Sequence, residues 1–285
     1  MATVALIANR EAIVVAMDYY RVLKQIHAIV QPRTYVEIGV RHGESWQLVG
    51  PDTHSIGIDP APAIRYNITG NGKLFEGTSD AFFAQYDPRA LLEQMPIDLA
   101  FIDGMHLFEN ALTDFINIER SCHPGSHILI HDCLPIDAVT SARERTTAVW
   151  SGDVWKLIVC LTKERPDLRI LVLDTAPTGL AVVTNCDPKS THLSSRLDTI
   201  KQQYTQVPYA TLGDEQSKRA LLRVCPADTP TLEKIFAPAP VSREPAEVMN
   251  PRLAAPARSP ALAPKQDYKA DSAPHITSLL VVPPA

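Results

Sequence analysis

The sequence has little that would suit a nucleic-acid or membrane partner. It holds 27 lysines and arginines against 32 aspartates and glutamates, a net charge of −5. A chain without a positive field does not attract polyphosphates or anionic lipids over its whole surface. Residues 1–20 lack a basic start and a small-residue cleavage site, and Arg10, Glu11 and Asp18 interrupt their apolar run. We therefore expect no nucleic-acid partner, no secretory signal and no membrane span.

Cysteine is also scarce, and its spacing excludes the usual cysteine-based sites. The five cysteines are odd in number and widely separated, without a CxxC pair or zinc-ligand spacing. Reduced thiols in a cytoplasmic protein are the simplest interpretation.

Proline is spread unevenly along the chain. Half of the 24 prolines fall after Cys225, among many alanines and without a sustained period. Such a segment cannot continue a helix or a strand ladder. We therefore predict an N-terminal helical segment (1–34), a main domain (35–190), a C-terminal helical extension (191–235) and a Pro/Ala-rich disordered tail (236–285).

The chain before the tail alternates strand-like and helix-like segments. Apolar residues at helical spacing predict a helix over about 9–30, in the stripe Ile13, Met17, Tyr20, Leu23, Ile26 and Val30. Short β-rich runs predict strands at 35–40, 55–59, 73–77, 97–103, 127–132, 168–174 and 179–185. Helix-compatible segments lie between them at 43–50, 79–87, 107–121 and 152–165.

This alternation predicts an α/β fold with helices on both faces of a mostly parallel sheet. The last two strands are joined only by TAPT, which is too short for a helical crossover, so they should form an antiparallel hairpin. The expected architecture is a doubly wound, seven-stranded, Rossmann-like sheet with an antiparallel terminal hairpin. That topology differs from the all-parallel sheet of nicotinamide-dependent enzymes.

The turn after the first strand is the first candidate binding site. In doubly wound sheets, ligands bind beyond the carboxyl ends of the strands. Gly39 and Gly43 allow a tight turn and close approach of a ligand, and Ser45 ends this loop. Their G-x-x-x-G spacing differs from the dinucleotide pattern GxGxxG.

Three polar residues extend this candidate cofactor site. Asp59 ends the second strand, where a carboxylate can accept both hydrogen bonds of a ribose diol. Glu37 carries a negative charge that suits a cationic sulfonium or amino-acid group better than a diphosphate. Ser79 can offer a hydroxyl near an adenine, although a helix N-cap is the commoner role at such a position.

Four segments resemble a known family: VEIGVRHGES, GIDP, FIDGMHLFENALTDF and PGSHILIHDCLP. Together they resemble class I S-adenosylmethionine-dependent methyltransferases, specifically methyltransferase domain family 24, over about residues 20–186. The resemblance implies S-adenosylmethionine as cofactor. Two positions depart from the family pattern, because Met105 stands where many relatives carry a small or acidic residue and Ser126 replaces a glycine.

The candidate chemical centre lies at the ends of the fourth and fifth strands. Asp103 and Asp132 should project into one crevice, with His106 three residues after Asp103. Two alternatives stay open: the carboxylates hold Mg²⁺, or His106 acts as general base. Asp103 can also contact the cofactor or cap the next helix, and alternation along a strand would turn His131 away from Asp132.

We expect methyl transfer to a hydroxyl, or to an amine, of a small molecule or sugar. The alternatives are a non-catalytic cofactor-binding or interaction module and an NAD-dependent oxidoreductase; the glycine spacing and the hairpin disfavour the last. A homo-oligomer is compatible with the sequence, which does not identify the methyl acceptor.

Overall fold

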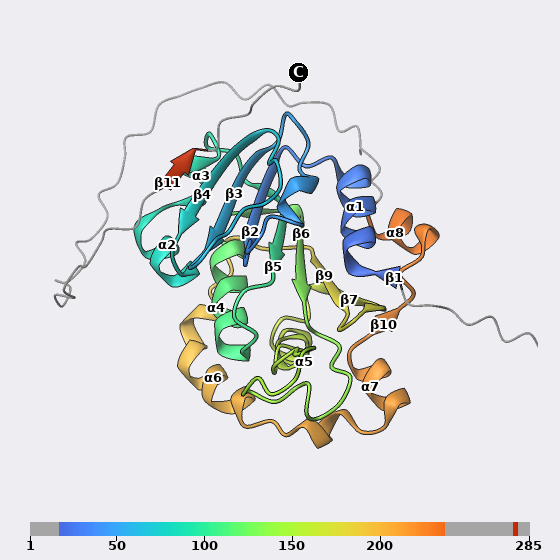
Figure 1. The fold of residues 1–285 in the computed structure, drawn as a ribbon. Helices are drawn as coiled ribbons and strands as arrows, with labels where there is room; N and C mark the ends of the chain where they lie inside the picture. Colours follow the sequence, from blue (N-terminus) through green and yellow to red (C-terminus); the bar gives the residue numbers. More distant parts are fainter. Residues whose placement is uncertain (1–16, 237–275, 279–285) are drawn as a thin grey trace, which may run out of the picture.

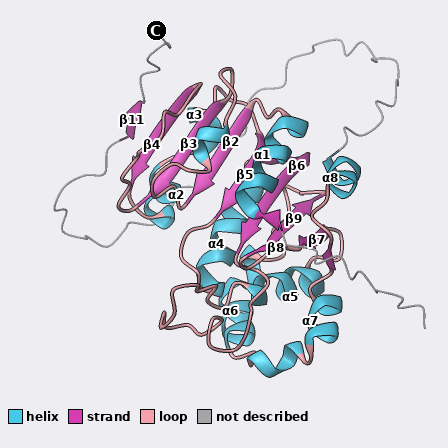
Figure 2. Cartoon of the chain, turned by 45° about the vertical axis from the view of Figure 1, so that its right-hand side comes forward, coloured by secondary structure: helices cyan, strands magenta, loops and turns pink. Residues whose placement is uncertain are grey.

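A central sheet runs through the molecule (Figures 1 and 2). The computed structural model describes residues 17–236 and 276–278. The strands of this sheet are β2 (Thr34–Ile38), β3 (His54–Asp59), β4 (Asn71–Glu76), β5 (Ile97–Ile102), β6 (Cys122–His131), β7 (Arg169–Leu173), β9 (Leu180–Thr184), β10 (Val224–Cys225) and β11 (Ile276–Ser278). Within the described residues, their order is β10-β7-β9-β6-β5-β2-β3-β4-β11.

The predicted topology is confirmed. Strands β2 to β6 pair with one another in parallel, while β9 is antiparallel to both β6 and β7. The sheet exceeds the expected seven strands because short strands extend both edges: β10 pairs with β7, and β11 pairs with β4. The TAPT connection contains β8 (Thr175–Ala176), which pairs with β1 (Met17–Asp18).

Helices cover both faces of the sheet, as Figure 1 shows. They are α1 (Tyr19–Val30), α2 (Ser79–Gln85), α3 (Pro88–Leu91), α4 (Phe108–Glu119), α5 (Trp155–Glu164), α6 (Leu197–Thr205), α7 (Glu215–Leu221) and α8 (Thr229–Phe236). Because strand side chains alternate, Val36 and Ile38 pack in the core beneath α4 and α5. Tyr35, the neighbour of Val36 on β2, points to the other face and packs in the core beneath α1 and α8.

Two predicted helices differ from the structure. The helix expected over 9–30 begins at Tyr19, because Asp18 caps its first turn and Met17–Asp18 pair with β8; residues 9–16, including Ile13, lie outside the described residues. The segment 43–50 forms only the 3₁₀ helix η1 (Trp46–Leu48), since the chain is already extended at Val49.

The C-terminal region contains α6, α7 and α8. Within the tail expected to be disordered, Ile276–Ser278 form β11, which pairs with the open edge of β4; the rest of 237–285 lies outside the described residues. None of the helices in the described part of the chain combines the length and apolar character that crossing a membrane requires.

Candidate active site

A cavity of about 780 Å³ lies where the parallel strands β2, β3, β5 and β6 end. Of the expected site residues, those that line it are Gly39, Ser45, Asp59, Ser79, Asp103, His106 and Asp132. Glu37 and Gly43 do not line it. A second cavity of about 690 Å³, between β7, β9, β10 and α8, contains none of these residues.

The loop after β2 is inserted between the ends of two neighbouring strands. The Gly39 amide donates to the Ile58 carbonyl at 2.8 Å, and the Asp103 amide donates to the Ile38 carbonyl at 2.8 Å. Gly39 has φ +92°, and a Cβ there would lie 2.0 Å from the Asp103 carbonyl oxygen. Only glycine fits this position, which explains the first glycine of the motif.

Glu37 lies behind this loop and does not face the cavity. Its side chain is fully buried, and its carboxylate accepts hydrogen bonds from Ser45 Oγ at 2.5 Å and Tyr35 Oη at 2.7 Å. Burial raises the pKa of Glu37 to about 8. Glu37 therefore lies beneath the loop and supports it through Ser45. The expected contact of Glu37 with a cationic group is not what the structure shows.

Asp59 stands at the end of β3, on the wall of the cavity. One carboxylate oxygen accepts the Arg41 amide at 2.7 Å and the other accepts the Ala61 amide at 2.8 Å. Each oxygen has a further lone pair. The carboxylate is therefore oriented by the main chain and keeps acceptor capacity for a ligand diol.

Ser79 is the first residue of α2 and lines the cavity. The N-cap role considered for Ser79 is wrong, because the Thr78 hydroxyl accepts the Ala81 amide at 3.2 Å. Ser79 also lies beside Asp114, whose pKa is raised to about 7 by burial despite the hydrogen bond from Ser79.

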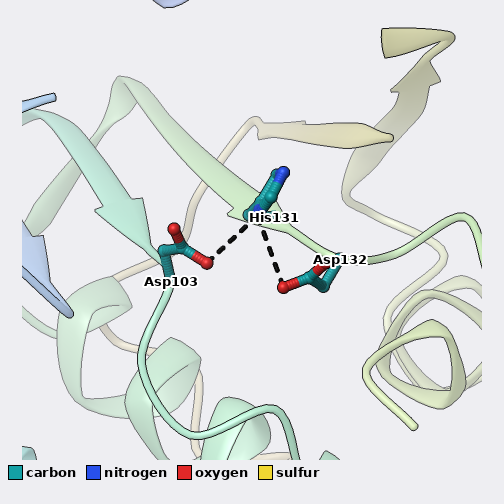
Figure 3. A group of neighbouring side chains, drawn as sticks. All are labelled: Asp103, His131 and Asp132. Atoms are coloured by element: carbon teal, nitrogen blue, oxygen red, sulfur yellow. Dashed lines mark hydrogen bonds and ion pairs between the residues drawn. The ribbon is translucent and has the colours of Figure 1, made fainter. Parts of the chain in front are cut away.

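Asp103, His131 and Asp132 form one cluster, which Figure 3 shows. His131 Nδ1 donates to Asp103 Oδ1 at 3.1 Å and lies 3.4 Å from Asp132 Oδ2. The interpretation of His131 as a residue turned away from Asp132 is wrong. Asp132 has φ +60°, which interrupts the alternation of an extended strand and leaves both side chains on the same side.

His106 bridges the two carboxylates of this cluster. Its Nε2 lies 3.6 Å from Asp103 Oδ1, and its Nδ1 lies 3.0 Å from Asp132 Oδ2. Burial alone would lower the pKa of His106, but Asp103 and Asp132 outweigh that effect and raise the pKa to about 10. Despite their burial, the two carboxylates in turn have pKa values below their usual range, because they face the two imidazoles.

The loop between β6 and α5 holds His106 in place. His106 Nδ1 donates to the Trp150 carbonyl at 2.9 Å, and the Trp150 ring stacks on the imidazole with centroids 5.0 Å apart. The Asp153 amide donates to the His106 carbonyl at 3.2 Å. A Cβ on Gly152 would lie 1.7 Å from that carbonyl oxygen. Because Nδ1 carries the proton donated to Trp150, Nε2 is the nitrogen that can exchange a proton.

A buried carboxylate ties the same loop to α4 and α5. Asp153 accepts the Phe108 amide at 2.7 Å, so Asp153 and not Asp103 satisfies the start of α4. Its other oxygen accepts Arg143 Nη1 at 2.7 Å and Lys156 Nζ at 3.0 Å. Arg143 also pairs with Glu109.

The sequence did not predict that Tyr19 and Tyr20 line the cavity, whereas Trp150 was expected to serve as packing or as a wall of the substrate pocket. Tyr19 lines it, and its ring stacks on His131 with centroids 4.0 Å apart. Tyr20 lines it too and donates to Glu44 at 2.9 Å. The helical periodicity predicted that Tyr20 packs in the core. The loop that carries Trp150 is irregular, so no periodicity predicts which residues Trp150 contacts.

Comparison with known proteins finds a match for the part of the chain that forms most of this cavity. Residues 36–133 match the family model described as a methyltransferase domain. A search of curated proteins finds no match.

Solved structures with a similar fold include the cofactor-bound protein Rv0187 from MTB, at 15% identity over 66% of this chain and 84% of that one (TM-score 0.44). Another is the O-methyltransferase TomG from Streptomyces achromogenes in complex with SAM, at 15% identity over 59% and 80% (TM-score 0.43). A third is an O-methyltransferase from Bacillus cereus in complex with SAH, at 14% identity over 58% and 79% (TM-score 0.42).

The family match falls on the strands and loops that form the cavity from Gly39 to Asp132, and it confirms the resemblance seen in the sequence. Residues 36–133, which include β3 to β6, thus match a methyltransferase domain.

Proposed function

We propose that this enzyme transfers the methyl group to a hydroxyl of a small molecule. The observation that carries the proposal is the position of His106 between Asp103 and Asp132 on the wall of the same cavity that contains Gly39 and Asp59. An imidazole held by carboxylates can accept the proton that a hydroxyl loses as its oxygen is methylated, once the positive charge of the bound cofactor lowers its pKa from about 10.

The chain's own residues fit the cofactor. Asp59 keeps free lone pairs for the ribose hydroxyls, and Gly39 and Ser45 bring the loop after β2 to the cavity wall. Ser79 and Asp103 complete the proposed cofactor contacts, while Glu37 and Gly43 shape the loop from behind. When bound, S-adenosylmethionine supplies the methyl group from a positively charged sulfur, and that charge disfavours the protonated form of a nearby imidazole.

With the cofactor bound, His106 Nε2 would take the proton of the acceptor hydroxyl as its oxygen received the methyl group, and S-adenosylhomocysteine would be the leaving product. The Trp150 carbonyl keeps the proton on Nδ1, so that Nε2 faces the reaction. Asp103 and Asp132 stabilise the imidazolium that forms. Alignment of the acceptor against the cofactor supplies much of the remaining acceleration.

A divalent cation is a second way to activate the acceptor hydroxyl. Ligand atoms of Asp103, His131 and Asp132 lie within 4.8 Å of one another, a set that fits such an ion. Mg²⁺ held there would polarise the acceptor hydroxyl.

The test is a screen of hydroxyl and amine acceptors scored by S-adenosylhomocysteine release, with Mg²⁺ or with a chelator. We expect release with hydroxyl acceptors and its loss in His106→Gln. Loss of activity with chelator supports the cation, whereas activity that persists assigns the chemistry to His106. If calorimetry detects binding of NAD and none of S-adenosylmethionine, the proposal is wrong; cofactor binding without transfer to any acceptor points to a non-catalytic module.

We further propose a cytoplasmic location. All five cysteines are free thiols, and four of them are buried. A set of unpaired cysteines is typical of a reducing compartment.

A further inference from the structure

The acceptor end of the cavity has an apolar wall. Met105 and Val149 line it with 59% and 38% of their surface exposed. Exposed apolar side chains that gather at a cavity mark a ligand surface more often than scattered ones do. Met105 also departs from the small or acidic residue that the family resemblance leads one to expect.

Trp150 gives this wall a fixed flat surface. Its indole Nε1 donates to the Ala142 carbonyl at 2.6 Å, and its ring stacks on His106 at an interplanar angle of 20°. A held aromatic ring beside the proposed base favours planar ligands, because offset stacking needs two flat faces.

Two arginines of the same loop differ in their partners. Arg143 pairs with Glu109 and Asp153 and anchors the loop. Arg145 lines the cavity, and its Nη2 donates to the Ala148 carbonyl at 3.2 Å. Among the residues that the structure describes, no carboxylate lies within ion-pair distance of Arg145. Its guanidinium therefore keeps the donors that match a ligand carboxylate.

The charges of the cavity determine how an anionic acceptor would lie. Asp103 and Asp132 face the proposed base, and Glu44 lines the cavity near Tyr20. These carboxylates repel an anion at the chemical centre. A ligand carboxylate is favoured at Arg145, which leaves the hydroxyl-bearing part of the ligand for His106.

We propose that the methyl acceptor is a hydroxylated aromatic carboxylate. Its ring packs against Met105, Val149 and Trp150, its carboxylate binds Arg145, and its hydroxyl faces His106. This inference rests on the proposed function, because it names the substrate class of the same site.

The test compares three probes that share a dihydroxyphenyl ring: protocatechuate, which carries a carboxylate, catechol, which carries no charge, and dopamine, which carries an ammonium. Binding to the full-length protein saturated with S-adenosylhomocysteine is measured by calorimetry. We expect protocatechuate to bind about tenfold more tightly than catechol, as for one charge-assisted pair in a partly exposed site, and dopamine, which offers Arg145 no carboxylate, to lack that gain.

The variant Arg145→Gln should remove this difference and leave the binding of catechol unchanged. Arg65→Gln is the matched control, because Arg65 is exposed and does not line the cavity. Equal affinities for protocatechuate and catechol, or a preference for protocatechuate that survives in Arg145→Gln, would overturn the inference. Failure of S-adenosylhomocysteine itself to bind would instead count against the proposed function.

Discussion

The two ends of the cavity are held together by different kinds of interaction. At the cofactor end, Gly39 and Asp59 are positioned by main-chain hydrogen bonds between neighbouring strands and loops. At the acceptor end, the His106 side chain is held by the carbonyl of Trp150, 44 residues further along the chain, and the Asp153 carboxylate anchors this loop to α4. The cofactor end thus belongs to the sheet, whereas the acceptor end depends on one anchored loop.

This difference predicts that the two ends can be damaged separately. Main-chain hydrogen bonds persist when most side chains change. A loop held by a buried carboxylate is lost when that one charge is removed. The following substitutions, in order of expected effect, test this separation.

The largest effect is expected for Asp153→Asn. The substitution removes the charge that faces Arg143 and the buried Lys156, so the unfolding free energy should fall by about 3 kcal/mol. Methyl transfer should be lost, while the folded protein still binds S-adenosylhomocysteine. Urea unfolding and calorimetry measure the two quantities. The control Glu144→Gln changes an exposed carboxylate of the same loop and should shift stability by less than about 0.5 kcal/mol. Unaltered transfer in Asp153→Asn would contradict the dependence of the acceptor end on this anchor.

For Gly39→Ala we expect a smaller loss of stability than for Asp153→Asn, and a loss of cofactor binding, which Asp153→Asn should keep. The new Cβ meets the Asp103 carbonyl oxygen at 2.0 Å, at a φ of +92°, which should cost about 2 kcal/mol of stability. Calorimetry should show S-adenosylhomocysteine binding at least about tenfold more weakly, because the loop must shift. Gly50→Ala, where the nearest atom would be 3.4 Å away, is the matched control. Equal affinities in the two variants would show that the loop tolerates the displacement.

Asp59→Asn should affect only the cofactor end. The variant keeps one carbonyl acceptor but loses the charge and the second acceptor, so binding of S-adenosylhomocysteine should weaken by about 1.5 kcal/mol. Asp52→Asn, at an exposed position, controls for the loss of a charge. An unchanged affinity in Asp59→Asn would remove Asp59 from the cofactor site.

The smallest effect is expected for Glu37→Gln, and it concerns stability. This substitution changes a buried carboxyl group that supports the loop after β2 through Ser45. Burial raises the pKa of Glu37 from 4.5 to about 8. Between these two values the unfolded chain loses this proton before the folded protein does, so the contribution of Glu37 to stability falls as the pH rises. The amide does not titrate. Urea unfolding should therefore show Glu37→Gln gaining stability relative to the parent protein between about pH 5 and about pH 8. A difference that stays constant with pH would mean that Glu37 does not keep its proton.

The sequence predicted the parts of the site that depend on local pattern. Gly39 and Asp59 follow strands whose apolar runs are unmistakable, and both lie where the strand ends predict them. The prediction for Glu37 was wrong because a side chain at the end of a strand can point to either face of the sheet. Only the tertiary structure, through the hydrogen bonds from Tyr35 and Ser45, directs the Glu37 side chain inward. His131 was misplaced because alternation assumes extended backbone, which Asp132 does not have.

The sequence by itself determined the alternating fold, the antiparallel hairpin and the loop after β2, because periodicity and glycine placement act over a few residues. Only the tertiary structure decided the acceptor end: the stacking of Trp150 on His106, the anchor at Asp153 and the difference between Arg143 and Arg145. These contacts join an irregular loop to distant helices. The tertiary fold determines which charged groups and aromatic rings meet, and no local sequence pattern predicts these pairs.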